Sequence, residues 1–405
     1  MLQCQHCLYV WMLLTFLSTV TPAPVIADDA NTSKASEARQ PLEGPLTPFL
    51  GEERFQVQQI FDSQRYPNVV VTLDGTVIVV RGQGDLSIRR SHDGGATWGA
   101  KIVVDKNAWH GGGATVVETP DTEHTGDLLL FAEEQHPPAP LTMYRSRDQG
   151  KTWQAEKPVI RKDKNGRIPS MHMNENGITL RHGAHAGRLI RPSRDYAKRN
   201  HRDQWPYHYT NAIYSDDGGK TWQTSDPFPE NGTGEAAIVE LSDGRLYYNS
   251  RVHWQAAKQH TRRRSAISDD GGQTWKEWRI VEALPDGRQD RSYGCMGGLT
   301  RLPVKDRDVL IFSNLDTPND VRERITVWAS FDGGESWPVK RLVDSGRSAY
   351  SALTAGRPGT KTEGWIYLHY EGDPGKEMKL ARFNLSWLLA GEPTGNGKVP
   401  AWVKP

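Results

Sequence analysis

The chain has 405 residues, a length that a single large β-architecture can fill alone. Its 50 basic and 49 acidic side chains leave a formal net charge of +1, which excludes a global field that would draw the protein onto nucleic acid or an acidic membrane. The 39 Gly, 25 Pro and 14 Trp residues favour many short strands joined by turns, and so an all-β class rather than a helical bundle.

The first 27 residues have the pattern of a secretion signal. An apolar run from Leu8 to about Val20 is followed by small residues that end at Ala27. The run is short for a membrane span, but no Lys or Arg precedes it, so a retained anchor is the alternative. We expect residues 1–27 to be removed and the mature protein to be secreted or periplasmic. Only Cys295 would then remain, and we expect it to be a small buried packing residue.

The segment after the signal is polar. Residues 28–52 are rich in Ala, Ser, Pro, Glu and Lys, which is typical of a flexible leader. We expect the folded domain at residues 53–392 and a C-terminal tail at 393–405. Within the domain, stretches such as NVVVTLDGTVIVV, GDLLLFAEE and AAIVELSDGRLYYNS alternate apolar with polar residues or form short apolar runs. They predict strands and hairpins with Asp-Gly turns.

A motif of eight residues, S-x-D-x-G-x-[TS]-W, is repeated along the domain. Its five copies begin at Ser91, Ser146, Ser215, Ser268 and Ser330. Their spacing is about that of a four-stranded propeller blade. The Asp can accept backbone N–H bonds within its own turn, Gly supplies a backbone angle closed to other residues, and Trp can fill the space between blades. The motif therefore predicts a β-propeller, and it lacks the further acidic positions of a calcium loop.

Five motifs and a final segment without one predict six blades. The last stretch, MKLARFNLSWLL, can pair with the first, RFQVQQIFDS, so that both termini share one blade and no sheet edge stays open. In a propeller, the innermost strands direct side chains at the central axis. Polar residues that are far apart in the sequence can therefore converge there.

Four arginines stand where inner strands are expected to begin or end. They are Arg65 in QRYPN, Arg81 in VVRGQGD, Arg251 in YNSRV and Arg322 in NDVRERITV. A cluster of guanidinium groups would bind a carboxylate or a phosphate through paired hydrogen bonds. Taken singly, each is more often a solvated surface residue, and Arg324 competes with Arg322 for the inward position.

These arginines belong to a longer pattern that resembles the exo-sialidases (neuraminidases), which are glycoside hydrolases with Asp-box, or BNR, repeats on a six-bladed β-propeller. The resemblance runs from about Arg54 to Leu389. Arg65-Tyr66-Pro67 resembles the family's Arg-Ile-Pro motif, whose arginine binds the substrate carboxylate, and differs from it at the middle residue. The expected fold is therefore an all-β, six-bladed, sialidase-like propeller.

The resemblance also implies catalytic residues. GEAAIVELSDGRLYYNSR is similar to the segment that carries the family's catalytic Glu and second arginine, which places Glu235 and Arg251 in those roles. The segment SAYS is similar to the one with the nucleophile, so Tyr350 is the implied nucleophile, although relatives often carry Asp where Ala352 stands. Asp85, in a shorter loop than the family's, is the implied acid/base.

The implied substrate-binding set is wider. It consists of Arg65, Arg251, Arg322, Arg81 and His172. His172 and Asn174 in MHMNENG could contact substrate hydroxyls, whereas His110 in HGGG is better explained as a loop residue satisfied by backbone. No spacing of His, Cys and Asp suggests zinc and no Gly-rich strand-to-helix turn suggests a nucleotide, so neither a metal nor a cofactor is expected.

The chemistry explains why these groups would be needed. A phenol with an ordinary pKa of about 10 is a poor nucleophile at neutral pH, so Tyr350 needs Glu235 to accept its proton. A neutral nucleophile also avoids the like-charge repulsion that a carboxylate would meet beside an acidic sugar. The expected reaction is hydrolysis of a terminal α-sialoside with retention, in which Asp85 protonates the leaving oxygen and then deprotonates water.

Two other functions stay open from the sequence. The same fold could act on another acidic sugar, by hydrolysis or elimination, and a panel of acidic glycosides would separate the two enzymes. A non-catalytic carbohydrate-binding propeller would keep the arginines but would not need Tyr350, Glu235 and Asp85 together. Either way the partner is an acidic saccharide or sialoglycoconjugate and not a nucleic acid, while linkage preference and oligomeric state are not encoded in these patterns.

Overall fold

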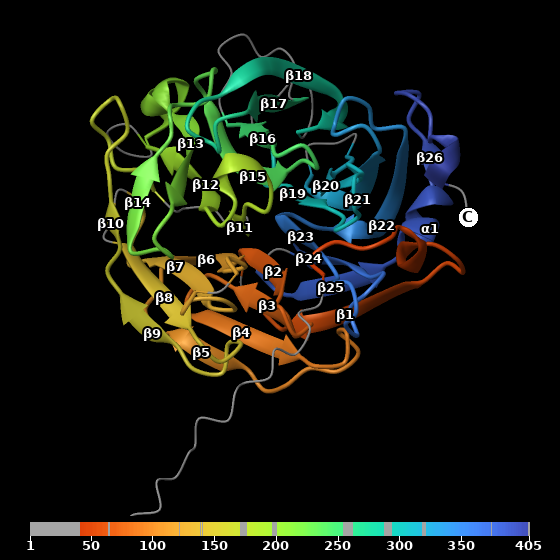
Figure 1. The fold of residues 1–405 in the computed structure, drawn as a ribbon, viewed down its shortest axis with the longest axis horizontal. Coiled ribbons are helices and arrows are strands. Elements are labelled where there is room, and N and C mark those ends of the chain that lie inside the picture. The colour runs from red at the N-terminus through yellow and green to blue at the C-terminus, as the bar shows by residue number, and fades with distance from the viewer. Residues whose placement is uncertain are drawn as a thin grey trace, which may run out of the picture. The chain divides into compact units, whose positions relative to one another are not determined.

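The computed structural model describes residues 41–63, 65–120, 122–137, 139, 141–170, 176–196, 201–253, 262–286, 294–317, 321–373 and 375–403. Within the unit Gln40–Pro405, these residues form six sheets arranged as blades around one axis, as Figure 1 shows. Neighbouring blades touch through their inner strands in ring order, and the last touches the first. The predicted six-bladed propeller is confirmed.

Blades 1 to 3 follow one another along the chain. Blade 1 consists of β2 (Pro67–Val71), β3 (Val77–Arg81), β4 (Leu86–Ser91) and β5 (Ile102–Asp105). Blade 2 consists of β6 (His110–Val116), β7 (Leu128–Glu133), β8 (Leu141–Ser146) and β9 (Gln154–Glu156). Blade 3 consists of β11 (Ile178–Thr179), β12 (Leu189–Asp195), β13 (Tyr209–Ser215), β14 (Thr221–Thr224) and the added edge strand β10 (Val159–Ile160).

Blades 4 to 6 complete the ring. Blade 4 consists of β15 (Thr233–Glu240), β16 (Leu246–Val252), β17 (Arg262–Ser268) and β18 (Lys276–Pro285). Blade 5 consists of β19 (Gly298–Arg301), β20 (Leu310–Leu315), β21 (Glu323–Ser330), β22 (Val339–Arg347) and β26 (Glu392–Pro393). Blade 6 consists of β23 (Ser351–Ala355), β24 (Ile366–Glu371), β25 (Met378–Phe383) and β1 (Phe55–Phe61). The helices are α1 (Leu385–Leu389) and the 3-10 turns η1 (Thr47–Phe49), η2 (Gly183–His185), η3 (Arg202–Tyr207) and η4 (Ala401–Val403).

The two ends of the chain close the ring, as the sequence predicted. The first strand, β1, pairs antiparallel with β25, and Phe55 lies opposite Phe383. Blade 6 therefore takes its outer strand from the N-terminal side and its three inner strands from the C-terminal side. Because separating these segments would expose a sheet edge, the pairing joins the termini to the rest of the wheel.

The Asp boxes form the predicted turns. In the first box the Asp93 carboxylate accepts the Thr97 amide at 2.9 Å and the Thr97 hydroxyl at 2.6 Å. The Ser91 hydroxyl donates to Asp93 at 2.7 Å and accepts the Gly95 amide at 2.8 Å. The serine-to-aspartate bond recurs in the other four boxes. The box tryptophans lie between blades: Trp222 is fully buried, and its ring centre lies 5.5 Å from that of Phe131 in β7 of blade 2.

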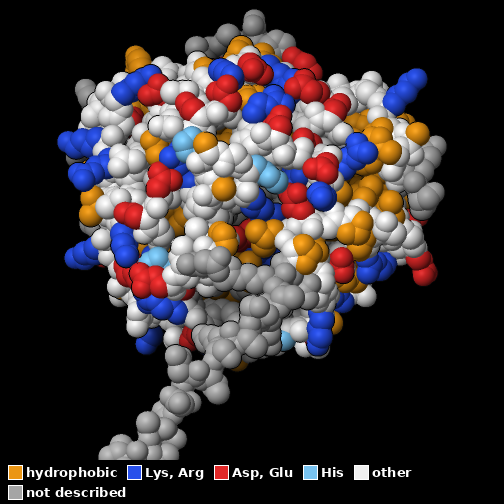
Figure 2. All heavy atoms as spheres, in the orientation of Figure 1, with side chains coloured by type: hydrophobic (Ala, Val, Ile, Leu, Met, Phe, Trp, Pro, Cys, Tyr) orange, Lys and Arg blue, Asp and Glu red, His pale blue; other side chains and the backbone are white. Residues whose placement is uncertain are grey.

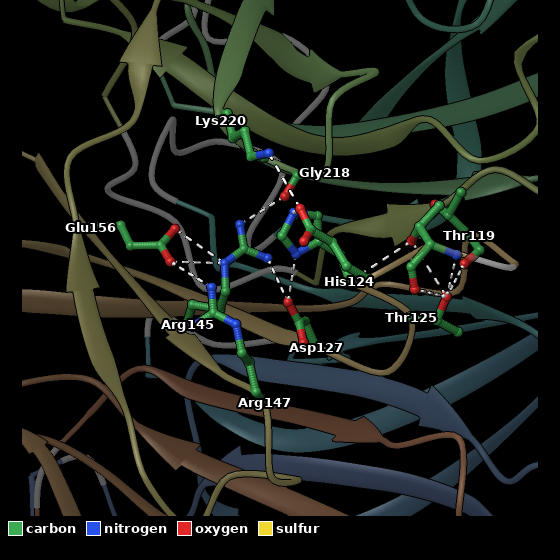
Figure 3. Close-up of polar contacts among 12 residues, drawn as sticks. Thr119, His124, Thr125, Asp127, Arg145, Arg147, Glu156, Gly218 and Lys220 are labelled. Atoms are coloured by element: carbon green, nitrogen blue, oxygen red, sulfur yellow. Dashed lines mark hydrogen bonds and ion pairs between the residues drawn. The ribbon is translucent and has the colours of Figure 1, made fainter. Parts of the chain in front are cut away.

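A second contact between blades had no signal in the sequence. In five of the blades an arginine donates to a backbone carbonyl in the Asp box of the next blade. The pairs are Arg90 with Gln149, Arg145 with Gly218, Arg188 with Gly271, Arg279 with Gly334 and Arg382 with Gly94. Figure 3 shows Arg145, which also binds Asp127 and Glu156. Each of these arginines fastens one blade to its neighbour, so the wheel is held by polar clasps as well as by tryptophan.

Both terminal segments pack further than their composition indicates. Gly44 forms a β-bridge with Val304, and Phe49 is 2% exposed, although both lie in the expected leader. In the expected tail, Asn396 accepts the Trp337 amide at 2.7 Å and Val403 is fully buried. Apolar side chains in both segments, such as Phe49 and Val403, pack into the same core cluster. No helix in the described part of the chain is long and apolar enough to cross a membrane.

Candidate active site

The candidate site lies where the inner strands of the blades begin. Arg65 and Tyr66 precede β2, His110 starts β6, Glu235 is the third residue of β15 and Tyr350 precedes β23. Strand burial explains this placement: β2, β6 and β15 are buried along their whole length, so their ends are where polar groups can meet a cavity. The face drawn in Figure 2 mixes basic and acidic side chains without a single-sign patch.

Tyr350, Glu235 and Arg251 form one buried group. The Tyr350 hydroxyl donates to Glu235 Oε1 at 2.9 Å, and Arg251 Nη1 donates to Glu235 Oε2 at 2.5 Å. The same Arg251 nitrogen lies 3.4 Å from the Tyr350 hydroxyl oxygen. The Arg251 and Glu235 side chains are 1% and 3% exposed. A carboxylate within hydrogen-bond distance of a phenol can accept its proton, which is the arrangement of an activated nucleophile.

Electrostatics show why the phenol needs that carboxylate. Burial, followed by the negative charge of Glu235, raises the pKa of Tyr350 well above its ordinary value, while Arg251 and Arg322 act in the opposite direction. At neutral pH the hydroxyl is therefore protonated. Burial would lower the pKa of the Arg251 guanidinium, but the Glu235 and Tyr350 charges raise it overall, so Arg251 stays a cation.

Arg65 is held beside the tyrosine by a buried carboxylate. Its Nε donates to Glu371 Oε1 at 3.1 Å, and its Cζ lies 5.0 Å from the centre of the Tyr350 ring. Glu371 also accepts the backbone amides of Tyr66 at 3.1 Å and of Tyr350 at 3.4 Å. One carboxylate thus fixes the first arginine and the backbone of the tyrosine together. The Arg65 side chain keeps 27% exposure, so it can reach a ligand.

The third arginine of the cluster is Arg322. Its Cζ lies 5.5 Å from the centre of the Tyr350 ring, and its Nη2 donates to the Gly294 carbonyl at 2.8 Å. Its competitor, Arg324, has a positive φ of 62° and donates through Nε to the Asp316 carbonyl at 3.2 Å. The structure therefore brings Arg65, Arg251 and Arg322 to one tyrosine and gives Arg324 another partner.

Asp85 has different surroundings. Its carboxylate pairs with Arg81 of β3 and lies 3.2 Å from the Nζ atom of Lys101. Lys101 directly precedes β5, the outermost strand of blade 1. Burial alone would raise the pKa of Asp85, but the hydrogen bonds from Arg81 and Lys101 hold it below its ordinary value. The two side chains that the resemblance assigned to acid catalysis and to substrate binding, Asp85 and Arg81, thus satisfy one another. The predicted ligand His172 lies outside the described residues, as does Asn174.

Several residues that line the same region had little or no sequence signal. Tyr66 takes a positive φ of 66° and packs its ring 3.8 Å from His110 and 5.6 Å from Tyr350. Such a backbone angle is costly for a large side chain and is typical of functional sites. Further round, Arg194 Nη2 lies 2.8 Å from His253 Nδ1. Burial and then Arg194 lower the pKa of His253 well below its ordinary value, so this imidazole is neutral.

The opposite end of the axis holds a separate cavity of about 130 Å³. There Glu118 lies 2.7 Å from Arg181 and 2.6 Å from Arg357, and Glu240 accepts the Arg181 amide at 2.7 Å. Asn176 stands on the axis and donates to the carbonyls of blades 1 and 6 at 2.8 and 3.1 Å. The charges of Glu118, Arg181 and Arg357 at this end are paired with each other. Among the described residues, no group of three or more His, Cys, Asp and Glu side chains could hold a metal ion.

The fold and the Asp boxes define a propeller of repeated BNR-type blades. The family described as "BNR repeat-like domain" matches residues 81–361, and the chain belongs to that family. Over 411 residues it is 31% identical to a sialidase of Micromonospora viridifaciens, a match that covers 90% of this chain and 59% of the relative. A sialidase of Bacteroides fragilis is 28% identical, with 72% of this chain and 57% of the relative covered. The chain thus spans less than two thirds of these relatives.

Solved structures agree on the fold. A Hadza microbial sialidase superposes with a TM-score of 0.62 at 24% identity, covering 80% of this chain and 66% of that one. The intramolecular trans-sialidase from Ruminococcus gnavus superposes with a TM-score of 0.60 at 18% identity, covering 81% of this chain and 96% of that one. At these identities the likeness establishes the sialidase-like propeller and nothing of the chemistry.

Proposed function

We propose that this protein is an exo-sialidase that hydrolyses terminal α-sialosides of sialoglycoconjugates with retention of configuration. The observation that carries the proposal is the hydrogen bond of 2.9 Å from the Tyr350 hydroxyl to Glu235, inside a cluster of three arginines. The proteins named sialidases among its relatives support the same reading.

Each group has a definite task in this proposal. Arg65, Arg251 and Arg322 hold the carboxylate of the sugar, which fixes the ring and places its anomeric carbon over the tyrosine. Glu235 takes the phenol proton as the Tyr350 oxygen attacks that carbon, and the sugar becomes bonded to the tyrosine. Water then releases the sugar in a second step, so two inversions give net retention.

The proton for the leaving oxygen needs a donor of its own. The resemblance assigns it to Asp85, and a general acid must be protonated before the first step. The ion pairs of Asp85 with Arg81 and Lys101 favour its ionised form instead.

A fluorogenic α-sialoside assay tests the proposal. We expect the wild type to release the fluorophore, and Tyr350→Phe and Arg322→Ala to lose most of that activity. Proton NMR of the first product separates mechanisms, since retention releases the α-anomer of the free sugar first. Activity that is unchanged in both variants would overturn the site, and turnover of another acidic glycoside in place of sialosides would change the substrate.

We also propose that the protein is exported, on the strength of the apolar run within residues 1–27. N-terminal sequencing of protein recovered outside the cytoplasm should begin at residue 28. A full-length N-terminus on membrane-bound protein would show a retained anchor instead.

A further inference from the structure

The surroundings of Asp85 raise the question of which group protonates the leaving oxygen. Its side chain reaches from the turn between β3 and β4 to Lys101, which borders the outermost strand of blade 1. Tyr350 and Glu235 lie instead at the starts of inner strands. A general acid must be within about 3 Å of the oxygen that it protonates, directly or through one water, so a carboxyl beside the starts of the inner strands fits better.

Glu133 is such a carboxyl. It ends β7 in blade 2, is 2% exposed, and stands directly opposite His110 in the strand pairing. Residues opposite one another on neighbouring strands share a face of the sheet, so the two side chains are neighbours. The His110 ring lies 3.8 Å from the Tyr66 ring, which lies 5.6 Å from that of Tyr350. Glu133 is therefore linked to the nucleophile through two intervening rings.

Both carboxylates also act on one buried tyrosine. Burial is the main cause that raises the pKa of Tyr196, Arg194 acts in the opposite direction, and the negative charges of Glu235 and Glu133 raise it further. Ser170 holds the Glu133 side chain in place: its hydroxyl donates to Glu133 Oε1 at 2.8 Å, and its backbone forms a bridge with Arg194.

The order of the blades shows on which side of the site Glu133 lies relative to the nucleophile. Glu235 belongs to blade 4 and Tyr350 leads into blade 6, so the nucleophile and its base centre on blade 5. In a ring of six blades, blade 2 stands opposite blade 5, and Glu133 is on blade 2. Displacement at the anomeric carbon requires the leaving group on the face opposite the nucleophile. Glu133 thus lies across the ring from the nucleophile, which is where we expect the leaving oxygen to depart.

We propose that Glu133 is the acid/base catalyst of this site, an assignment that rests on the proposed sialidase function. In the first step the Tyr350 oxygen bonds to the anomeric carbon and gives its proton to Glu235, while the bond to the leaving oxygen breaks and Glu133 protonates that oxygen. In the second step a water bonds to the anomeric carbon and gives its proton to Glu133. The bond to Tyr350 then breaks, and Glu235 returns the proton to the phenol oxygen.

The test compares two leaving groups in Glu133→Gln. A sialyl-lactose has a poor leaving group and needs the proton, whereas a sialoside of an acidic nitrophenol does not. We expect kcat/KM to fall by about 100-fold or more for the first and by less than about 10-fold for the second. Sodium azide should then restore turnover of the nitrophenyl substrate and give an α-sialyl azide, because azide attacks the sialyl-enzyme without a general base.

Controls keep the result specific. Glu134→Gln, at the exposed neighbouring position, should leave kcat/KM unchanged for both substrates. Asp85→Asn goes through the same assay, and a leaving-group-dependent loss in that variant instead of in Glu133→Gln would overturn the proposal. If Glu133→Gln does not fold, Glu133→Asp keeps the carboxyl one methylene short and is judged by the same ratio. Equal losses for both substrates would show a structural role. A wild type inactive on every sialoside would refute the proposed function itself, and the acid with it.

Discussion

Replacing Glu235 by glutamine should separate the chemical task of this carboxylate from its structural one. Glu235 and Arg251 are 3% and 1% exposed and 2.5 Å apart, so Glu235→Gln removes the carboxylate that pairs with a buried guanidinium. Breaking a buried ion pair from one side costs about 3–5 kcal/mol. Because the Gln amide oxygen still accepts a hydrogen bond, we expect the lower end, about 3 kcal/mol of unfolding free energy.

The matched variant is Tyr350→Phe, which keeps the ion pair. It removes one hydrogen bond to a carboxylate that Arg251 still satisfies, so it should cost only about 1 kcal/mol. Its sialidase activity should nevertheless fall at least about 1000-fold, equivalent to about 4 kcal/mol of transition-state stabilisation. Guanidinium unfolding followed by tryptophan fluorescence, together with the fluorogenic assay, measures both quantities. A Glu235→Gln protein as stable as the wild type would refute the argument that this charge pair is buried and coupled.

Three further outcomes follow from the structure. Arg145→Met removes the cation that pairs with the buried Asp127 and should lower the unfolding free energy by about 3 kcal/mol. The matched variant Arg147→Met, at the exposed neighbour seen beside Arg145 in Figure 3, should change it by less than about 0.5 kcal/mol. Guanidinium unfolding of the two variants compares these values directly. Burial raises the pKa of Cys295 to about 11, so iodoacetamide should leave Cys295 of the native protein unmodified at pH 8 and label it only after unfolding. Peptide mapping that finds Cys295 rapidly labelled in the native protein would contradict this. Burial lowers the pKa of His369 from 6.5 to about 4. The contribution of this neutral imidazole to the unfolding free energy is therefore complete above pH 6.5, and up to about 3 kcal/mol of it is lost as the pH falls towards 4. The unfolding free energy should fall less steeply over that range in His369→Gln, and equal slopes in the two proteins would contradict a role of His369 in the pH dependence.

The features that sequence could predict are local and repeated. An Asp box is closed by contacts within seven residues, such as those of Ser91, Asp93 and Thr97, so its five copies reveal the blades without knowledge of the rest. The pairing of β1 with β25 followed from two strand-like stretches at the ends of the domain. The inter-blade clasp of Arg145 with Gly218 could not be foreseen, because a lone arginine in a strand gives no sign of the carbonyl that it will meet.

The site shows the same division. Motif order along the chain led to Tyr350, Glu235, Arg251 and Arg322, and the structure brings them together. Motif order also led to Asp85, but a short loop allows it to pair with Arg81 four residues earlier, a contact that chain order does not reveal. Glu133 is the reverse case. In the sequence it is a single acidic residue at the end of a buried strand. Only its pairing with His110 and the position of blade 2 in the ring make it a candidate for the acid/base catalyst.

The most direct test of the mechanism is to trap the sugar on the protein. A fluorinated sialyl fluoride reacts like a substrate but forms a sialyl-enzyme that hydrolyses slowly, so digestion and mass spectrometry can locate the modified residue. We predict one added sugar on the peptide that contains Tyr350, and none in Tyr350→Phe. An active enzyme that carries the sugar on another residue, or that turns over sialosides without ever forming an adduct, would contradict a tyrosine nucleophile activated by Glu235.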